Sequence, residues 1–399
     1  MSKSSVQDPV VIVGLARTPM GAFQGAFSTV KASTLGAVAI KAAVKESGVD
    51  AQKVEQAIMG CVLPAGQGQA PARQAAFKAG LSETCEATTI NKMCGSGMQA
   101  AIMVHDALKA GSVDIAVAGG MESMTNAPYL MPNARGGARM GDTKMLDSMM
   151  YDGLTDAYEG GGPGNSAMGV FADMIAAEYQ FTREAQDAYA IESVRRAKVA
   201  QESGDFEREL APVNVKHRKG DILVSEDEGP KNARPEKIPS LRAVFTKDGT
   251  VTAANASSIN DGAAALVLTT AEAAGDRARA RIVGHASHAQ APGLFTTAPV
   301  PAAQKLLAQV GWSKDDVDLW EVNEAFAVVP MAFMHEMGLS RDIVNVNGGA
   351  CALGHPIGAS GARIMVTLLN ALEKRGLKRG VAAICIGGGE GTAIAIERL

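Results

Sequence analysis

The chain has 399 residues, a hydrophobic fraction of 47% and a formal net charge of −4, so it can fill a large core and is expected to form two or three packed units. With 20% charged residues and no basic excess, it is neither a disordered polyelectrolyte nor a typical nucleic-acid binder. It has no run of 18 apolar residues and no apolar leader, so we expect a cytoplasmic protein without a membrane contact.

The N-terminal part predicts strands that alternate with helices. Short apolar runs indicate strands at 10–13, 54–59, 87–90 and 115–118, and helical spacing of apolar residues indicates helices at 33–47, 71–79 and 95–109. Gly48 and Gly80 directly follow two of these helices, as helix-ending glycines do, and Pro71 stands at a favoured first helical position. This order is typical of βαβ units around a parallel sheet.

The segment at about 122–250 differs from what precedes it, and we expect it to be an inserted loop domain. Its first part is rich in methionine, since nine of the 19 methionines lie between 121 and 174, and it contains a glycine-rich run at 160–164. Core filling is the commoner use of methionine, and adaptable contact with ligands or partners is the other. Thr182 is expected to cap a helix that runs to about Ser203.

The second half of this segment is polar and basic. The basic residues are Lys216, Arg218, Lys219, Lys231, Arg234, Lys237 and Arg242. They indicate either a solvated surface or a grip on an anionic ligand such as a nucleotide phosphate. The sequence leaves both interpretations open.

The order of the N-terminal elements recurs late in the chain. Gly284 lies 270 positions after Gly14 at the end of a similar apolar run, and Gly311 lies 263 positions after Gly48. The last glycine of Gly-Ala-Ser-Gly, at 361, lies 264 positions after that of Cys-Gly-Ser-Gly, at 97. Nearly constant offsets predict two copies of one α/β unit related by a pseudo-two-fold axis. We expect an N-terminal half at 1–121 and 251–275, the loop domain at 122–250, and a C-terminal half at 276–399.

The cysteines point to reactive or buried thiols. There are five, Cys61, Cys85, Cys94, Cys351 and Cys385, without a CxxC pair, so neither a disulfide framework nor a structural zinc site is expected. Cys94 lies in the run 91–97, NKMCGSG, between a predicted strand and a predicted long helix. A helix N-terminus favours a thiolate, so Cys94 is the candidate nucleophile, with a buried structural thiol as the alternative. Cys61, Cys85 and Cys351 are expected to be packing residues.

Three further residues stand in glycine-framed or strand-end positions. His355 precedes the helix that mirrors the one after Cys94, so the pseudo-symmetry is expected to bring the two residues together as nucleophile and base. Cys385 ends a predicted buried strand before Gly387. By itself it indicates a core cysteine, and the alternative is a group that acts in acid–base chemistry while glycine N–H groups bind an oxyanion. Asn323 follows another strand, at the carboxyl end of which functional sites commonly lie in α/β proteins.

The other histidines, His105, His217, His285, His288 and His335, are expected to be structural or on the surface.

Taken together, the motifs resemble the thiolase family, and its biosynthetic type most closely. The matching segments are Ala16-Arg17-Thr18-Pro19, NKMCGSG at 91–97, Gly119-Gly120-Met121-Glu122-Ser123-Met124, Asn255-Ala256-Ser257, Asn260-Asp261-Gly262, Asn323-Glu324-Ala325-Phe326-Ala327, GHPIGASG at 354–361 and CIGGG at 385–389. They span nearly the whole chain in the order typical of the family. The resemblance implies an α/β fold of two βαβαβαββ halves in five αβαβα layers, with a loop domain over the site.

The resemblance also implies a two-step ping-pong condensation of two acetyl-CoA molecules to acetoacetyl-CoA and coenzyme A. It implies that Cys94 carries the acetyl group, His355 activates Cys94, and Cys385 removes the α-proton of the second acetyl-CoA. Asn323, through a water, and His355 would hold the thioester oxygen of the second substrate. The backbone N–H groups of Cys94 and Gly387 would form the oxyanion hole. No metal or other cofactor is implied, and the family implies a homotetramer built from dimers.

The resemblance places four more residues along the path of coenzyme A and its pantetheine: Ser257, Met168, Ala325 and Phe326. Two departures from the family pattern bear on this path. Ala167 stands where biosynthetic members often have histidine, after a short insertion around 160–164, and Phe295 stands where a methionine is common near the acyl pocket. Both leave the preferred acyl chain length open.

Three alternatives compete with the acetyl-transferring interpretation. A degradative 3-ketoacyl-CoA thiolase for longer chains tends to have Cys-Ser-Ser-Gly at the nucleophile, where this chain has Cys-Gly-Ser-Gly. A decarboxylating condensing enzyme of related fold would need histidine at Asn323. A non-catalytic thiolase-like protein that binds acyl-CoA would be expected to lose Cys94, His355 or Cys385, and all three are present.

Overall fold

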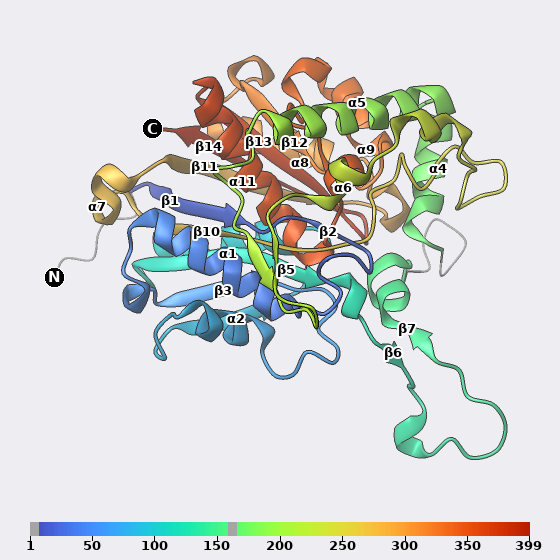
Figure 1. Ribbon diagram of the computed structural model, residues 1–399. Coiled ribbons are helices and arrows are strands. Elements are labelled where there is room, and N and C mark those ends of the chain that lie inside the picture. Colours follow the sequence, from blue (N-terminus) through green and yellow to red (C-terminus); the bar gives the residue numbers. More distant parts are fainter. Residues whose placement is uncertain (1–7, 159–165) are drawn as a thin grey trace.

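The computed structural model describes residues 8–158 and 166–399, which form a ten-stranded sheet with helices on its faces (Figure 1). The N-terminal strands are β1 (Val10–Arg17), β2 (Gly21–Ala22), β3 (Gln56–Gly60), β4 (Glu86–Ile90), β5 (Ile115–Ser123) and β10 (Asn260–Thr270), and the C-terminal strands are β11 (Ala280–Ala289), β12 (Leu319–Val322), β13 (Arg379–Ile386) and β14 (Glu390–Arg398). Their order is β4-β3-β5-β10-β1 followed by β11-β14-β13-β12, and β2 pairs with β10. Within the described ranges, no helix is both long and apolar enough to cross a bilayer.

The sheet is mixed: each half contains the predicted parallel βαβ pairing, and antiparallel strands complete the halves and join them. Strand β3 runs parallel to β4 and β5, and β12 runs parallel to β13, but all other strand pairs of this sheet are antiparallel. Strand β14 follows β13 after a three-residue turn, which is too short for a parallel crossover. Strand β10 takes the equivalent place in the N-terminal half, antiparallel to β5.

The predicted internal repeat is confirmed. The N-terminal order β1-α1-β3-α2-β4-α3-β5-β10 recurs as β11-α8-β12-α9-α11-β13-β14, and a single parallel bridge between Trp320 and Val344 takes the place of the third strand. Even an irregularity is repeated: the register shifts between Ile12 and Gly14 in β1 and at the corresponding positions, 270 residues later, in β11. Strands β1 and β11 pair across the join between the halves.

The molecule has five layers, because successive side chains of a strand point to opposite faces of the sheet and join different cores. The helices are α1 (Ala32–Ser47) and α2 (Pro71–Ala79) on one outer face, α3 (Ser96–Lys109) and α11 (Ile357–Arg375) in the centre, and α8 (Pro299–Val310) and α9 (Val328–Met337) on the other outer face (Figure 1). In β1, Val11 and Val13 face α1 while Ile12 joins the central core. In β13, Ile384 joins the central core while Ala383 faces the second outer layer. The αβαβα layering is therefore confirmed.

The two central helices cross at glycine. A Cβ on Gly97 of α3 would lie 2.6 Å from the backbone nitrogen of Ala362, and a Cβ on Gly361 of α11 would lie 2.5 Å from that of Met98. These contacts are reciprocal because Gly361 and Ala362 are the repeat counterparts of Gly97 and Met98. No other residue type fits at this distance without moving backbone. The crossing lies next to the N-terminal ends of both helices.

The chain between β5 and β10 folds over this framework. It contains the helices α4 (Met168–Glu178), α5 (Arg183–Glu202) and α6 (Glu228–Asn232), a π-helical turn (Met149–Leu154), and the hairpins β6 (Tyr129–Leu130) with β7 (Leu146–Asp147) and β8 (Val213–Val215) with β9 (Ile222–Val224). The predicted cap is confirmed: Thr182 Oγ1 accepts a hydrogen bond from Ala185 N at 3.2 Å. Helix α4 was not predicted, because its apolar residues surround the helix rather than forming a stripe. Two short helices outside this segment are α7 (Ala271–Ala274) and α10 (Ala350–Leu353).

Core filling accounts for only part of the methionine-rich stretch. Met121, Met124 and Met149 are buried, whereas Met131, Met140, Met145, Met150 and Met174 are exposed. The hairpin β6–β7 carries several of these exposed side chains and extends away from the body of the molecule (Figure 1). The basic residues are mostly exposed, and Lys231 pairs with Glu226, which fits a solvated surface.

The glycine crossing generates the first prediction. Replacing Gly97 with alanine should lower the free energy of unfolding by about 1–3 kcal/mol, because the added methyl group meets backbone that cannot turn away. Chemical denaturation followed by circular dichroism measures the change. Gly136→Ala is the control, since a Cβ there meets no atom within 4 Å and its φ is not positive. A Gly97→Ala protein as stable as the control would contradict the proposed packing.

Candidate active site

A largely apolar cavity of about 640 Å³ opens beside the N-terminal ends of the two central helices. Its wall contains these candidate residues: Cys94, Met168, Ser257, Ala325, Phe326, His355 and Gly387. Cys385 and Asn323 are fully buried and are not part of the lining. The cavity therefore brings together residues from both halves and from the inserted segment.

The loop that presents Cys94 is held by its own side chains. Asn91 Oδ1 accepts a hydrogen bond from Met93 N at 2.9 Å. Ser96 Oγ accepts from Lys92 N at 2.8 Å and donates to the carbonyl of Met93 at 2.6 Å. Met93 adopts a left-handed conformation with φ 45°, which is strained for a non-glycine residue and turns the chain sharply before Cys94. Helix α3 begins at Ser96, so Cys94 lies next to a helix N-terminus as predicted.

The surroundings of Cys94 act on its pKa in opposite directions. Burial raises the pKa of the thiol to about 11, while hydrogen bonds from the backbone N–H groups of Gly387 and of Cys94 itself favour the thiolate. Burial, followed by the nearby Cys94 sulfur, raises the pKa of Cys385 well above its ordinary value. At neutral pH both thiols are therefore protonated, and ionising Cys94 requires a proton acceptor.

His355 has one nitrogen available for that purpose. Ser360 Oγ donates to the carbonyl of Pro356 at 2.9 Å and so accepts from His355 Nδ1, which lies 2.5 Å away. Nδ1 therefore carries the hydrogen, and Nε2 has a free lone pair and no hydrogen-bond partner within the described protein. Burial, with a smaller effect of the Arg363 charge, lowers the pKa of His355 to about 3. The resting imidazole is neutral and can accept a proton.

Asn323 is a buried amide without a partner for its side chain. Its backbone N–H donates to Ala383 at 3.0 Å, which places it directly after β12. Neither Oδ1 nor Nδ2 has a hydrogen-bond partner in the described protein, although the residue is fully buried. An amide and an imidazole nitrogen that are both unsatisfied fit a role in binding a polar group or a water.

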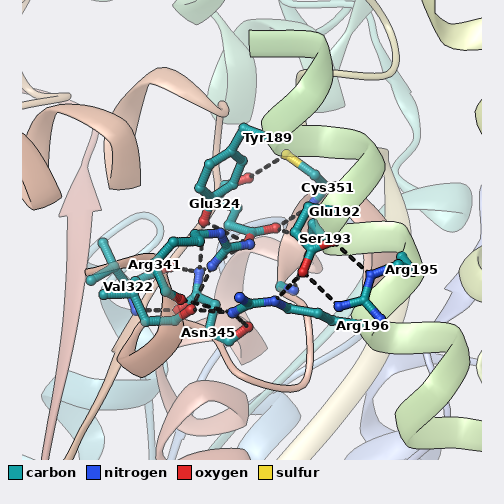
Figure 2. A network of polar contacts seen from close by, with 12 residues as sticks. Tyr189, Glu192, Ser193, Arg195, Arg196, Val322, Glu324, Arg341, Asn345 and Cys351 are labelled. Atoms are coloured by element: carbon teal, nitrogen blue, oxygen red, sulfur yellow. Dashed lines mark hydrogen bonds and ion pairs between the residues drawn. The ribbon is translucent and has the colours of Figure 1, made fainter. Parts of the chain in front are cut away.

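A buried network fixes the loop that carries Asn323, and sequence reasoning missed it (Figure 2). Glu324 accepts hydrogen bonds from Tyr189 Oη at 2.9 Å, Ser193 Oγ at 2.6 Å, Asn345 Nδ2 at 2.9 Å and Cys351 N at 3.0 Å. The donors come from α5, from the segment after α9 and from α10. Cys351, predicted to be a packing residue, contributes its backbone to this network, and its thiol lies near the Glu324 carbonyl, 3.8 Å away.

A second buried carboxylate joins the halves. Glu122, at the end of β5, accepts from Val62 N at 2.8 Å, Leu63 N at 3.2 Å and Gly358 N at 2.9 Å. Burial raises the pKa of Glu122 to about 7, and the backbone donors act against that rise. Gly358 lies in the first turn of the helix that follows His355, so Glu122 anchors the histidine loop to the N-terminal half. Its role could not be read from the motif alone.

Aromatic side chains narrow the inner part of the cavity. Phe295 and Phe326 both line it and make an edge contact with 6.5 Å between ring centroids, and Phe245 packs on the other side of Phe326. Ala167, the position at which the family often has histidine, also lines the cavity. The predicted insertion at 160–164 lies outside the described residues. Cys61 and Cys85 are buried away from the cavity.

The fold and this site together describe an enzyme that transfers acyl groups: two copies of one α/β unit enclose a cavity with a thiol, an imidazole and backbone donors. The chain belongs to the thiolase family. "Thiolase, N-terminal domain" matches residues 10–272 and "Thiolase, C-terminal domain" matches residues 276–398.

Similar proteins extend over the full length. The chain is 50% identical over 394 residues to acetyl-CoA acetyltransferase of Escherichia coli and 49% identical over 394 residues to that of Rhizobium meliloti, covering 98% of this chain and 99% of each relative. Among solved structures, the acetyl-CoA acetyltransferase of Bacillus anthracis matches with a TM-score of 0.95 and 39% identity, over 99% of this chain and 100% of the other. The Acat5 thiolase of Ascaris suum, solved in complex with coenzyme A, matches with a TM-score of 0.92 and 44% identity, over 98% and 100%.

The pKa values of the thiol and the imidazole generate the second prediction. In the His355→Ala protein, alkylation of Cys94 by iodoacetamide should slow at least about tenfold at neutral pH and then rise about tenfold per pH unit toward pH 11, because only the free thiolate reacts. In the unaltered protein the profile should be shallower, since His355, neutral throughout the range above about pH 3, can take the Cys94 proton as the sulfur attacks. Peptide mass spectrometry of the Cys94 peptide measures the rate.

The exposed His217→Ala is the control for this experiment and should behave as the unaltered protein. Parallel pH profiles for the His355→Ala and unaltered proteins would show that His355 Nε2 does not accept the Cys94 proton.

Proposed function

We propose that the protein is an acetyl-CoA C-acetyltransferase that reversibly condenses two acetyl-CoA molecules to acetoacetyl-CoA and coenzyme A. The observation that carries the proposal is the shared cavity: the Cys94 thiol and the imidazole of His355, with its unpaired Nε2, line one apolar space that Gly387 also borders. The names of the full-length relatives support the same activity.

In the first half-reaction, His355 Nε2 takes the proton from Cys94 Sγ, and the sulfur attacks the carbonyl carbon of acetyl-CoA. Negative charge develops on the carbonyl oxygen, where the N–H groups of Cys94 and Gly387 stabilise it. The carbon–sulfur bond to coenzyme A then breaks, and the departing thiolate takes the proton from the imidazolium. The acetyl group remains on Cys94 as a thioester.

In the second half-reaction, the Cys385 thiol first gives its proton to the neutral Nε2 of His355, and the resulting thiolate removes a proton from the α-carbon of a second acetyl-CoA. Asn323, through a water, and His355 hold the thioester oxygen and so stabilise the enolate. The α-carbon attacks the acetyl carbonyl on Cys94, and the departing Cys94 sulfur takes the proton from the His355 imidazolium, which releases acetoacetyl-CoA and restores the neutral thiols and imidazole. The raised pKa of Cys385 makes its thiolate a strong base, and in the thiolytic direction its thiol supplies the proton.

The alternatives receive less support. Phe295 and Phe326 line the cavity and contact each other, and we infer that these rings restrict the length of the acyl chain, which disfavours a degradative 3-ketoacyl-CoA thiolase. A non-catalytic acyl-CoA-binding protein has no need for the unpaired Nε2 of His355 or for the second thiol, Cys385. Met168, Ser257, Ala325 and Phe326 are proposed to line the path of the coenzyme A arm.

We further propose that the enzyme uses no metal or other cofactor in this reaction, because two thiols, an imidazole and backbone donors supply the nucleophile, base, acid and oxyanion hole. We propose that the protein is cytoplasmic and forms a homotetramer. Within each chain, we propose an N-terminal half at 1–121 and 251–275, a loop domain at 122–250, and a C-terminal half at 276–399. The exposed apolar side chains of the hairpin β6–β7, among them Tyr129 and Met140, support a contact between subunits.

The roles of the two thiols can be separated by substitution. Cys94→Ser should lower the thiolysis of acetoacetyl-CoA at least about a thousandfold, because the covalent intermediate is lost. Cys385→Ser should lower condensation at least about a hundredfold while Cys94 is still acetylated by acetyl-CoA, as mass spectrometry would detect. Cys61→Ser is the control, since Cys61 lies outside the cavity. Turnover retained in Cys94→Ser, or equal loss of both steps in Cys385→Ser, would refute the scheme.

The aromatic wall predicts a preference for short acyl chains that one side chain controls. Phe295→Ala should raise kcat/KM for 3-ketohexanoyl-CoA relative to acetoacetyl-CoA about tenfold or more, because the space that the ring fills becomes available to the added methylene groups. The ratio within one variant is insensitive to any loss of folded enzyme. Val244→Ala, at an exposed part of the wall, should leave the ratio unchanged. An unchanged ratio in Phe295→Ala would place the control of chain length elsewhere.

A further inference from the structure

Two histidines and an aspartate gather outside the active site, at the opposite end of α3 from Cys94. His105 and Asp106 lie in α3 of the N-terminal half, and His285 lies in β11 of the C-terminal half. His105 is nine residues beyond the start of α3, which puts the cluster roughly 14 Å along the helix axis from the active-site end. None of the three residues lines the active-site cavity, so the cluster has no part in the proposed reaction.

The geometry of the cluster is that of a set of ligands converging on one point. Asp106 Oδ1 lies 2.9 Å from His105 Nδ1 and 3.0 Å from His285 Nε2. The imidazole rings meet edge to face, with 5.1 Å between their centroids, and one ligand atom from each residue lies within 4.8 Å of the others. Ligand atoms about 2.0–2.1 Å from a tetrahedral zinc ion are about 3.3 Å apart. The carboxylate oxygen would therefore move by a few tenths of an ångström from each nitrogen, and the two imidazole nitrogens, which lie within 4.8 Å of each other, would close to a similar separation.

We propose that His105, Asp106 and His285 bind a divalent transition-metal ion of the zinc class. Two imidazoles and one carboxylate are ligands that Zn²⁺ and Co²⁺ accept readily and that Mg²⁺ and Ca²⁺ do not prefer. A surface hollow of about 260 Å³, lined by both histidines, provides the room in which water completes the coordination.

The charges around the cluster leave the three ligands available. Lys109, one turn further along α3, donates from Nζ to the carbonyl oxygen of Asp8 at 2.8 Å. Arg281, four positions before His285 in the chain, also lines the hollow and pairs with the carboxylate of Glu397 at 2.6 Å. Both cations are therefore engaged with groups outside the cluster. A bound ion would tie α3 of one half to β11 of the other and add a cross-link to the join that β1 and β11 form.

Cobalt distinguishes this site from the catalytic thiols, which are themselves possible metal ligands. The full-length protein, with its reactive cysteines first alkylated by iodoacetamide, is titrated with Co²⁺ and followed by absorbance, and Zn²⁺ binding is measured by calorimetry. We expect one equivalent to bind, with visible bands of a nitrogen and oxygen site and without the intense near-ultraviolet band of cobalt thiolate. Zn²⁺ should also raise the melting temperature, since it binds the folded state.

The variants Asp106→Asn and His285→Gln test the assignment, and His288→Gln, from the opposite face of the same strand, is the control. Each test variant should weaken Co²⁺ binding at least about tenfold and abolish the zinc-dependent rise in melting temperature, while the control binds as the unaltered protein does. Asp106 is largely exposed, so its variant is expected to fold, and the melting temperature without metal checks this. No binding by the alkylated protein, or equal binding by both test variants and the control, would overturn the proposal.

Discussion

The active site depends on the backbone contact between the two central helices. At Gly97 and Gly361, α3 and α11 approach so closely that neither position has room for a Cβ atom. Because each helix begins a few residues before this crossing, the loops that carry Cys94 and His355 are brought to the wall of the same cavity. The pseudo-two-fold repeat makes the contact reciprocal. Symmetry in the scaffold thus produces an asymmetric pair, with a thiol from one copy and an imidazole from the other.

Burial determines the resting protonation states of Cys94 and His355. It raises the pKa of Cys94 to about 11 and lowers the pKa of His355 to about 3, so both groups are neutral near pH 7. A resting ion pair of thiolate and imidazolium is therefore disfavoured in the unliganded cavity. In the proposed reaction, charge separates only when a thioester carbonyl is present to accept the developing charge and the N–H of Gly387 is there to hold it. An apolar site of this kind limits side reactions of a free thiolate with other electrophiles.

The features that could be predicted from the sequence are those marked by a local pattern or by the internal repeat. Nearly constant offsets between the glycine markers predicted that the loops of Cys94 and His355 approach each other, and both residues line the same cavity. The sequence pattern did not predict that β10 lies antiparallel between β1 and β5. Strand β10 follows a long insertion, and its partner strands are distant from it in the sequence. The carboxylates of Glu122 and Glu324 were missed as organising groups for the same reason: their donors come from segments far apart in the chain. Ser360 could have been suspected from its place in the motif that contains His355, but its hydrogen bond to Nδ1 depends on the bend at Pro356.

The burial of α11 has a consequence for the way this protein is made. Every residue from Ile357 to Leu372 is buried, and this helix packs on strands of the sheet that come from both halves of the chain. During synthesis, α3 can cover part of the inner face of the N-terminal half, but the part over β5 and β10 that α11 covers stays exposed until nearly the last part of the chain has left the ribosome. Contacts that join residues so distant in sequence form slowly, and the exposed apolar face is meanwhile open to aggregation. The same interlocking that assembles the cavity therefore makes the nascent chain a natural client for chaperones until its C-terminal strands are complete.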